Sequence, residues 1–217
     1  MHNSINNLIT IERQIKARFN QSINSKVIAV SKTFCMKEIK PLINHGHIHF
    51  GENKVQESVE KWTDVKRSFQ NIKLHMIGKL QTNKVKYVIP LFDYIHSLDN
   101  LKLAEKISVE QKKRNKYLKI FIQVNIGHEQ QKSGINPKNL KEFYNICISD
   151  LKLDVIGLMC IPPQDGDVKK YFTHMFDLKN SLDLKELSMG MSSDYIKAIE
   201  YGATFVRIGS KIFGNRI

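Results

Sequence analysis

The chain has 217 residues, of which 41% are hydrophobic and 25% are charged, and its formal net charge is +13. These values are typical of a globular protein and exclude a largely disordered chain or a coiled coil. Its 3 cysteines lack metal-type spacing, exclude a disulfide framework and favour a reducing compartment. No apolar run approaches the roughly 20 residues that span a bilayer, and the first residues lack the features of a signal peptide. We therefore expect a cytoplasmic protein with no membrane partner.

The positive charge has two interpretations. Lys and Arg together number 34 against 21 acidic residues, a balance that attracts nucleic acid or phosphorylated ligands. Most of these cations are lysines scattered along the chain, whereas proteins that read DNA sequence rely on arginine. We interpret the charge as a solvated surface and expect no nucleic acid among the partners.

Eight short apolar stretches alternate with longer amphipathic segments along the chain. The stretches are rich in Ile, Val and Phe and are bounded by Gly, Asn, Ser or Pro, which is typical of buried strands. The predicted strands are 27–32, 47–53, 74–80, 94–99, 119–126, 155–162, 186–192 and 205–210. The predicted helices are 4–21, 36–45, 54–68, 82–89, 100–114, 137–149, 167–182 and 193–201, with Asn53, Asn100, Asn136 and Ser192 or Ser193 as candidate caps.

This alternation predicts an α/β fold with a parallel sheet, and eight strand–helix units predict a closed (β/α)8 TIM barrel. At this length the barrel occupies the whole chain as one domain, residues 1–217, with an extra helix at its N-terminus. An open, doubly wound sheet is the alternative, but no predicted strand leads into a GxGxxG turn.

Lys32 ends the first predicted strand, and the carboxyl ends of the strands form the working face of such a barrel. Partial desolvation at a barrel mouth lowers the pKa of a lysine and leaves more of the neutral amine that Schiff-base chemistry needs. The alternative is a lysine that leaves the end of the strand into water.

Two turns rich in Gly and Ser follow the seventh and eighth predicted strands. Barrels commonly bind phosphate at this place, where backbone N–H groups and hydroxyls donate hydrogen bonds. The candidate donors are Ser192, Ser193, Gly209 and Ser210. Two ordinary capped helices are the alternative.

Arg207 lies two residues before Gly209, so both project from the same side of the eighth predicted strand. If that side is the barrel interior, the buried guanidinium needs an acceptor, either an internal carboxylate or an atom of a ligand. An amine, a phosphate cup and a cation between them fit pyridoxal 5′-phosphate (PLP). A Schiff-base aldolase acting on a sugar phosphate fits the same pattern.

His47 and His49 share one face of the second predicted strand. An open metal site needs a third ligand, and no acidic residue or cysteine stands beside them. We expect polar packing in or under the barrel and no metal.

At these residues the chain resembles the pyridoxal phosphate homeostasis protein family, the YggS/PROSC-like proteins. Matching blocks run nearly from end to end, among them AVSKT (29–33), HFGENKVQE (49–57), LSMGMSSDY (187–195) and ATFVRIGSKIFG (203–214). The resemblance implies a barrel of the alanine-racemase type (PLP fold type III) that carries PLP as an internal aldimine on Lys32. It also implies phosphate contacts from Ser192, Ser193, Gly209 and Ser210, Arg207 at the pyridine nitrogen, a cofactor lining by Asn53 and Met191, and a basic loop with Lys132.

An arginine beside the pyridine nitrogen leaves that nitrogen unprotonated, so the ring is a weaker electron sink. Two-base racemization also needs an acid on the opposite face of the ligand, which related racemases take from a second domain. We therefore expect a monomeric carrier that buffers PLP (vitamin B6) or delivers it to apo-enzymes, with indirect effects on amino-acid and keto-acid metabolism. A PLP-dependent amino-acid racemase or related enzyme of weak activity is the alternative.

Overall fold

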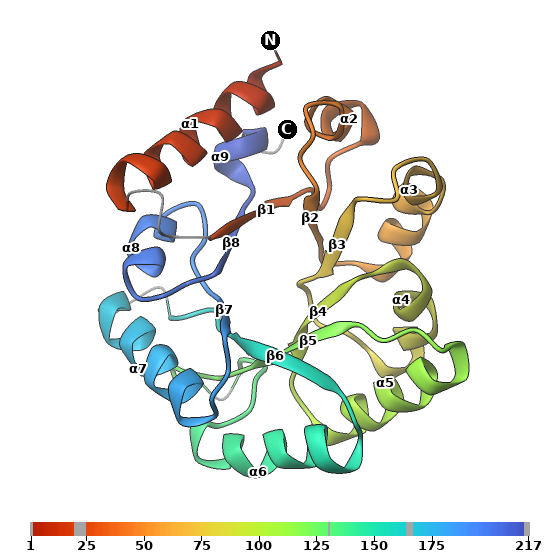
Figure 1. The fold of residues 1–217 in the computed structure, drawn as a ribbon, viewed down its shortest axis with the longest axis vertical. Coiled ribbons are helices and arrows are strands. Elements are labelled where there is room, and N and C mark those ends of the chain that lie inside the picture. The colour runs from red at the N-terminus through yellow and green to blue at the C-terminus, as the bar shows by residue number, and fades with distance from the viewer. Residues whose placement is uncertain (1, 20–24, 130, 164–166, 215–217) are drawn as a thin grey trace.

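Eight parallel strands form a closed barrel, and helices surround it (Figure 1). The computed structural model describes residues 2–19, 25–129, 131–163 and 167–214. The first strand pairs with the last, with Ile28 opposite Arg207 and Ala29 opposite Ile208, and this pairing closes the barrel. The strands are β1 (Lys26–Val30), β2 (His49–Glu52), β3 (Lys73–Met76), β4 (Tyr94–Leu98), β5 (Lys119–Gln123), β6 (Asp154–Met159), β7 (Glu186–Ser188) and β8 (Phe205–Ile208). The predicted closed barrel is confirmed.

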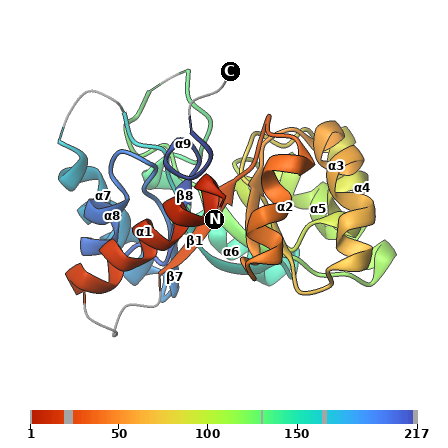
Figure 2. The ribbon, with the colours of Figure 1, turned by 90° about the horizontal axis from the view of Figure 1, so that it is seen from above.

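The helices cover the outside of the barrel, with α3, α4 and α5 on one side and α7 and α8 on the other (Figure 2). The extra N-terminal helix is present as α1, and residues 20 and 21 of its predicted range lie outside the described residues. The helices are α1 (Asn3–Phe19), α2 (Met36–Asn44), α3 (Val55–Ser68), α4 (Val85–Leu91), α5 (Leu101–Arg114), α6 (Leu140–Asn145), α7 (Val168–Ser181), α8 (Tyr195–Glu200) and α9 (Ser210–Phe213). Short helical turns lie at Thr82–Lys84, Pro137–Asn139 and Ile146–Asp150. No described helix is long and apolar enough to cross a bilayer.

Two of the predicted helix starts are wrong. Helix α3 begins after Lys54 rather than after Asn53, and α8 begins after Asp194 rather than after Ser192 or Ser193. The candidate caps Asn100 and Asn136 do accept backbone N–H hydrogen bonds, as expected. Because both wrong starts are shifted along the chain, Asn53 and the two serines stay in the loops at the carboxyl ends of their strands.

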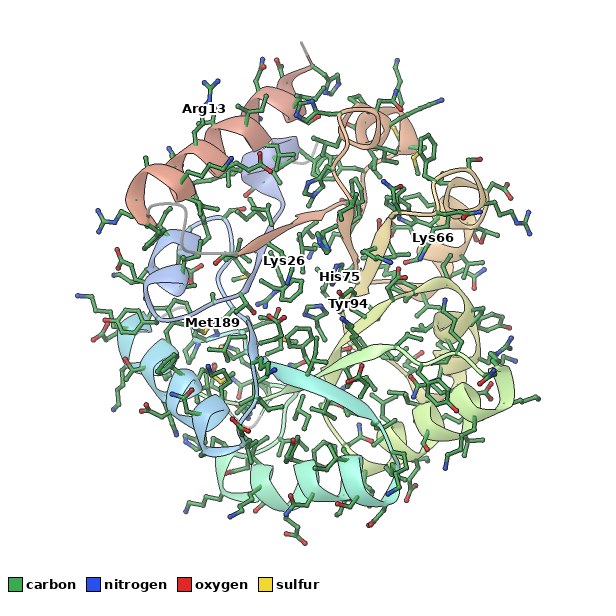
Figure 3. All side chains as sticks on the ribbon, viewed as in Figure 1. Arg13, Lys26, Lys66, His75, Tyr94 and Met189 are labelled. Atoms are coloured by element: carbon green, nitrogen blue, oxygen red, sulfur yellow. The ribbon has the colours of Figure 1, made fainter. Side chains whose placement is uncertain are left out.

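The core has two layers. The larger one fills the space between strands and helices, and a smaller one inside the barrel contains Tyr94, Phe121 and Phe205. Figure 3 looks down the barrel and shows His75 and Tyr94 near its centre, where the two rings stack with centroids 4.2 Å apart. His49 forms a hydrogen bond with His75 there, so the expected polar packing of His49 is confirmed. Among the described residues, no group of His, Cys, Asp or Glu side chains is placed to hold a metal ion.

The buried histidines predict a loss of stability in mild acid. Burial lowers the pKa of His47 and of His49 from 6.5 to about 4, and it lowers the pKa of His75 and of His96 well below 6.5. Below pH 6.5 the unfolded chain therefore binds protons that the folded chain does not. The free energy of unfolding should fall as the pH drops from about 6.5 towards 4, by up to about 1.4 kcal/mol per pH unit for each ring.

Urea unfolding at pH 7, 6 and 5 tests this expectation. The urea midpoint should fall steadily in this range, because the unfolded histidines bind protons there. Carboxylates contribute little to this fall, since they titrate mostly below pH 5. The variant His174→Gln, which changes an exposed histidine on α7, should show the same pH dependence as the unmodified chain. A midpoint that stays constant from pH 7 to pH 5 would contradict the expectation.

Candidate functional site

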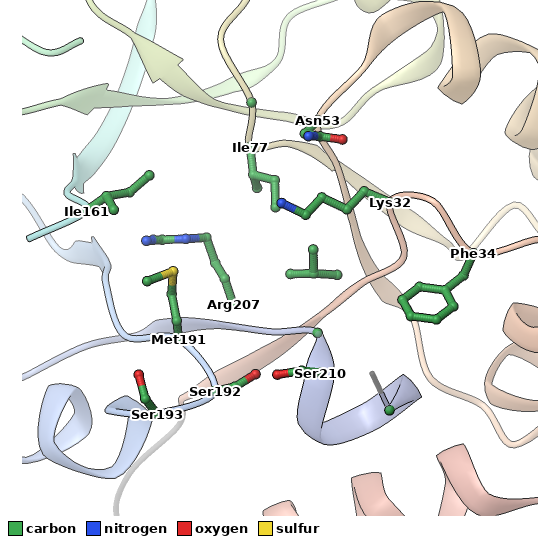
Figure 4. Close-up of a pocket in the computed structure, with 14 residues that line it drawn as sticks. Lys32, Phe34, Asn53, Ile77, Ile161, Met191, Ser192, Ser193, Arg207 and Ser210 are labelled. Atoms are coloured by element: carbon green, nitrogen blue, oxygen red, sulfur yellow. The ribbon is translucent and has the colours of Figure 1, made fainter. Parts of the chain in front are cut away.

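A pocket of about 710 Å³ opens at the carboxyl ends of the strands (Figure 4). Its lining comes from the loops after β1, β2, β3, β6, β7 and β8 and from residues of the strands β1 and β8 themselves. All the residues that the sequence analysis assigned to a cofactor line it: Lys32, Asn53, Met191, Ser192, Ser193, Arg207, Gly209 and Ser210. The fold therefore brings the predicted set together in one cavity.

The sequence analysis missed the apolar wall of the pocket. Val30, Phe34, Ile77 and Ile161 form this wall, and Gly78 and Gly214 complete the lining. Figure 4 shows the side chain of Lys32 extending towards Ile77. Apolar residues at strand ends look the same in a sequence whether they join the core or line a cavity, so no signal was available to separate them.

The turn that carries Lys32 is held by side chains of α3. The next residue, Thr33, has a φ of 69°, a left-handed conformation that is unusual for a β-branched residue. Its N–H donates to Glu57 Oε1 at 2.8 Å, and Lys61 Nζ donates to the carbonyl of Ser31 at 3.0 Å. These bonds compensate a strained turn, which costs about 1–3 kcal/mol, and fix the backbone on both sides of Lys32.

A buried carboxylate connects this turn to α3 and β2. Glu52 is fully buried, and its Oε1 accepts from Lys61 Nζ at 3.1 Å, from Ser31 Oγ at 2.7 Å and from Trp62 Nε1 at 2.9 Å. Lys61 also bridges to Glu57 at 2.8 Å. The ammonium of Lys61 thus balances the buried carboxylate of Glu52 and also the carboxylate of Glu57, which accepts from Thr33.

Arg207 forms the floor of the pocket. Only 5% of the residue is exposed, and Nη1 donates to the carbonyl of Ser188 at 2.7 Å and to its Oγ at 2.8 Å, while Nη2 donates to the carbonyl of Cys160 at 2.8 Å. These acceptors are neutral oxygens, so the internal carboxylate considered from the sequence is not the partner. Burial lowers the pKa of Arg207, yet a guanidinium keeps its charge in proteins. Arg207 on β8 and Gly209 directly after it both line the pocket, which confirms that the two residues face the same, inner side.

The two turns after β7 and β8 meet at one side of the pocket. Figure 4 shows the hydroxyls of Ser192 and Ser210 pointing towards one another, with Ser193 beside them. Helix α8 has 6 residues and α9 has 4, so their macrodipoles are small and any anion would be held by local N–H and O–H donors. A neutral hydroxyl cluster beside Lys32 and Arg207 suits a dianionic phosphate.

Two features of the lining fit a bound ligand. The Oδ1 atom of Asn53 is buried and has no partner among the described residues, although buried amides are normally hydrogen-bonded. A Cβ atom built at Gly209 would meet only Val30, at an ordinary 3.4 Å. Packing within the protein therefore does not require glycine at this position, whereas close approach of a ligand to the backbone would.

Lys132 lies outside this pocket. It lines a neighbouring cavity of about 320 Å³ together with Lys79 and Asn125, and it pairs with Glu129. The two cavities share Ile77, Gly78 and Ile161. The basic loop is thus next to the main pocket, and its role in cofactor handling stays a prediction.

Comparison with known proteins identifies the family. Residues 7–216 match the model of the alanine racemase N-terminal domain. The chain is 41% identical over 201 residues to the pyridoxal phosphate homeostasis protein of Aquifex aeolicus, in an alignment that covers 88% of this chain and 87% of that protein. The chain belongs to the pyridoxal phosphate homeostasis protein family. It is also 34% identical to the member from Escherichia coli over 233 residues, which cover 100% of this chain and 98% of that one.

Solved structures agree with this membership. The family member PipY of Synechococcus elongatus, solved with PLP bound, superposes with a TM-score of 0.79 at 31% identity and covers 94% of this chain and 99% of its own. An alanine racemase of Clostridium difficile superposes with a TM-score of 0.73 at 16% identity, and this likeness shows the fold alone. The match covers 99% of this chain and 57% of the racemase. The predicted barrel of the alanine-racemase type is confirmed.

Removal of the Lys61 ammonium should destabilise the chain strongly. The variant Lys61→Met leaves the buried Glu52 carboxylate without its cation, a change that costs about 3–5 kcal/mol in comparable buried pairs. The matched control on the same helix is Arg67→Met, which removes an exposed pair with Asp64 and should cost less than about 1 kcal/mol. Urea unfolding of both variants measures the difference, and equal losses would contradict the account of the Lys32 turn.

Proposed function

We propose that this chain binds PLP in the pocket of Figure 4 and serves PLP (vitamin B6) homeostasis by storing and delivering the cofactor. The observation that carries the proposal is the convergence of Lys32, Arg207 and two serine turns on one cavity, in a chain of this family. PLP, when bound, supplies an aldehyde that condenses with a lysine amine.

Lys32 is the residue proposed to supply this amine. Of the described residues that line the pocket, it is the one lysine. The hydrogen bonds that Glu57 and Lys61 make to the neighbouring backbone fix where its side chain starts. Positioning of this kind lowers the entropic cost of bringing an amine to a carbonyl.

The two turns are proposed to hold the phosphate. Ser192 and Ser193 contribute hydroxyls from the turn after β7, and Gly209 and Ser210 contribute a close backbone approach and a third hydroxyl from the turn after β8. The positive charges of Lys32 and Arg207 favour a dianion in the same cavity. A sugar phosphate would bind these turns equally well. Arg207 favours PLP, because its guanidinium can donate to the ring nitrogen of PLP.

Arg207 is proposed to face the pyridine nitrogen, with Asn53 and Met191 along the ring. A guanidinium donates hydrogen bonds and cannot accept them, so a ring nitrogen bound to it stays unprotonated. The ring then withdraws electrons weakly, which suits storage better than the breaking of bonds in an amino acid.

The lining supports a carrier over an enzyme. Among the described residues around the pocket, Lys32 and Arg207 are the titratable ones, whereas racemization needs a second acid–base group on the opposite face of the ligand. At the mouth, Ile161 is 41% exposed and Met191 is 38% exposed, which leaves the cavity open to exchange. Weak activity as an amino-acid racemase or related enzyme remains the second candidate, because it would use the same lysine.

We also propose a cellular compartment and an oligomeric state for the protein. We place it in the cytoplasm as a monomeric, single-domain chain that supplies PLP to apo-enzymes and so affects amino-acid and keto-acid metabolism indirectly. Burial raises the pKa of Cys147 and of Cys160 to about 12, so neither buried thiol is reactive. All three cysteines are free, which is typical of a reducing compartment.

Chemical trapping tests the assignment. The protein is incubated with PLP, reduced with borohydride, digested and mapped by mass spectrometry. The label should fall on the peptide that contains Lys32 and should be lost in Lys32→Ala, because no other lysine lines the described pocket.

The matched control is Lys79→Ala, which changes a lysine of the neighbouring cavity and should keep the label on Lys32. A label that persists in Lys32→Ala would refute the assignment. Racemization of alanine by the loaded protein at an ordinary enzymatic rate of about 1 s⁻¹ or more would favour the enzyme.

A further inference from the structure

A continuous chain of hydrogen bonds crosses the barrel interior below the pocket. Nη1 of Arg207 donates to Ser188 Oγ at 2.8 Å, and this oxygen lies 2.8 Å from Nδ1 of His96. Nε2 of His96 lies 2.9 Å from Nδ1 of His75, whose Nε2 lies 3.0 Å from Nδ1 of His49. We refer to His96, His75 and His49 as the histidine column. It joins β4, β3 and β2 to the arginine on β8.

The column is rigid and uncharged. His96 and His75 are fully buried, and His96 stacks on Phe121 with ring centroids 4.3 Å apart, while His75 stacks on Tyr94 at 4.2 Å. Because burial lowers the pKa of both rings, they are neutral at pH 7. A neutral imidazole has one donor nitrogen and one acceptor nitrogen. A ring that accepts a hydrogen bond at one nitrogen therefore donates at the other, and all the bonds of the column run in the same direction.

Arg207 fixes that direction. A guanidinium only donates, so Ser188 Oγ accepts from it and turns its own hydrogen towards Nδ1 of His96. Nδ1 of His96 is then an acceptor, and its Nε2–H donates to His75. The same step repeats from His75 to His49, which makes every ring of the column the Nε2–H tautomer.

The opposite direction is unfavourable. It would point the Nδ1–H of His96 at Ser188 and leave the serine hydrogen without an acceptor in the chain. It would also turn the positive end of each imidazole dipole towards the guanidinium. In the direction set by Arg207, the lone pairs of all the rings face the positive charge, and successive bonds polarise one another.

We propose that Ser188 and the histidine column position Arg207 and stabilise its charge without neutralising it, and so set the affinity of the pocket for a ring with an acceptor nitrogen. A carboxylate in their place would form an ion pair and cancel the charge that faces the pocket. The column instead stabilises the cation through neutral dipoles. These are positioning residues that act through Arg207, and the ligand part of the inference rests on the proposed function.

The tautomers can be observed without any ligand. Long-range ¹H–¹⁵N spectra of the unmodified chain at pH 7 separate Nε2–H from Nδ1–H imidazoles. The expected result is the Nε2–H tautomer for both His96 and His75. The Nδ1–H tautomer at His96 would overturn the proposal, because Ser188 could not then donate to that ring.

Ligand affinity tests the action on Arg207. The probes are PLP and an analogue in which a CH group replaces the ring nitrogen. The loss of a charge-assisted hydrogen bond network in Ser188→Ala should weaken PLP binding about tenfold and leave the affinity for the analogue unchanged. The matched control Ser68→Ala, at an exposed serine of α3, should change neither affinity.

A purely structural role would give another result. Equal weakening of both ligands by Ser188→Ala, or no change in either, would overturn the proposal. The pair His96→Phe and His96→Asn adds a rescue: the phenyl ring should weaken PLP binding, and the amide oxygen of asparagine, which can accept from Ser188, should restore most of it. If the unmodified chain bound neither ligand, the proposed function would be refuted, and the tautomer spectra would still decide the direction of the column.

Discussion

The buried positive charge of Arg207 is the constraint on which the site depends. A guanidinium inside a barrel needs oxygen acceptors in fixed places. Ser188 provides them from the neighbouring strand β7, and Cys160 provides one from the position directly after β6. Ser188 in turn forms a hydrogen bond with His96, which forms one with His75 deeper in the barrel. This arrangement keeps the cation charged at the floor of a cavity that is also lined by Lys32, apolar walls and neutral hydroxyls.

Closure of the barrel brings the other residues of the site next to Arg207. Because β1 pairs with β8 in register, with Ala29 opposite Ile208, the turn that carries Lys32 and the turn that carries Ser210 leave the sheet side by side. The Lys32 turn is fixed from the other side by α3, through Glu57 and Lys61. Amine, anion donors and cation thus come from distant parts of the sequence, and the strand register together with the contacts from α3 sets their spacing.

Local features of the sequence were sufficient for the barrel and for the polar residues at its mouth. Lys32, Ser192 and Gly209 sit at the carboxyl ends of predicted strands, so their common location follows from the parallel topology. The partners of Arg207 could not be predicted in the same way. Ser188 and His96 meet across the barrel, and their contact depends on stagger and ring packing that no local pattern encodes. The start of α3 was predicted wrongly because Asn53 is of a residue type that commonly caps helices, whereas in the structure its side chain lines the pocket.

A crystal structure of the chain soaked with PLP tests the central assignment most directly. The account predicts density continuous with the Lys32 side chain, the phosphate between the turns after β7 and β8, and the ring nitrogen at the guanidinium of Arg207. Density placed instead beside Lys79 and Lys132, or a ring turned so that the phosphate meets Arg207, would contradict it.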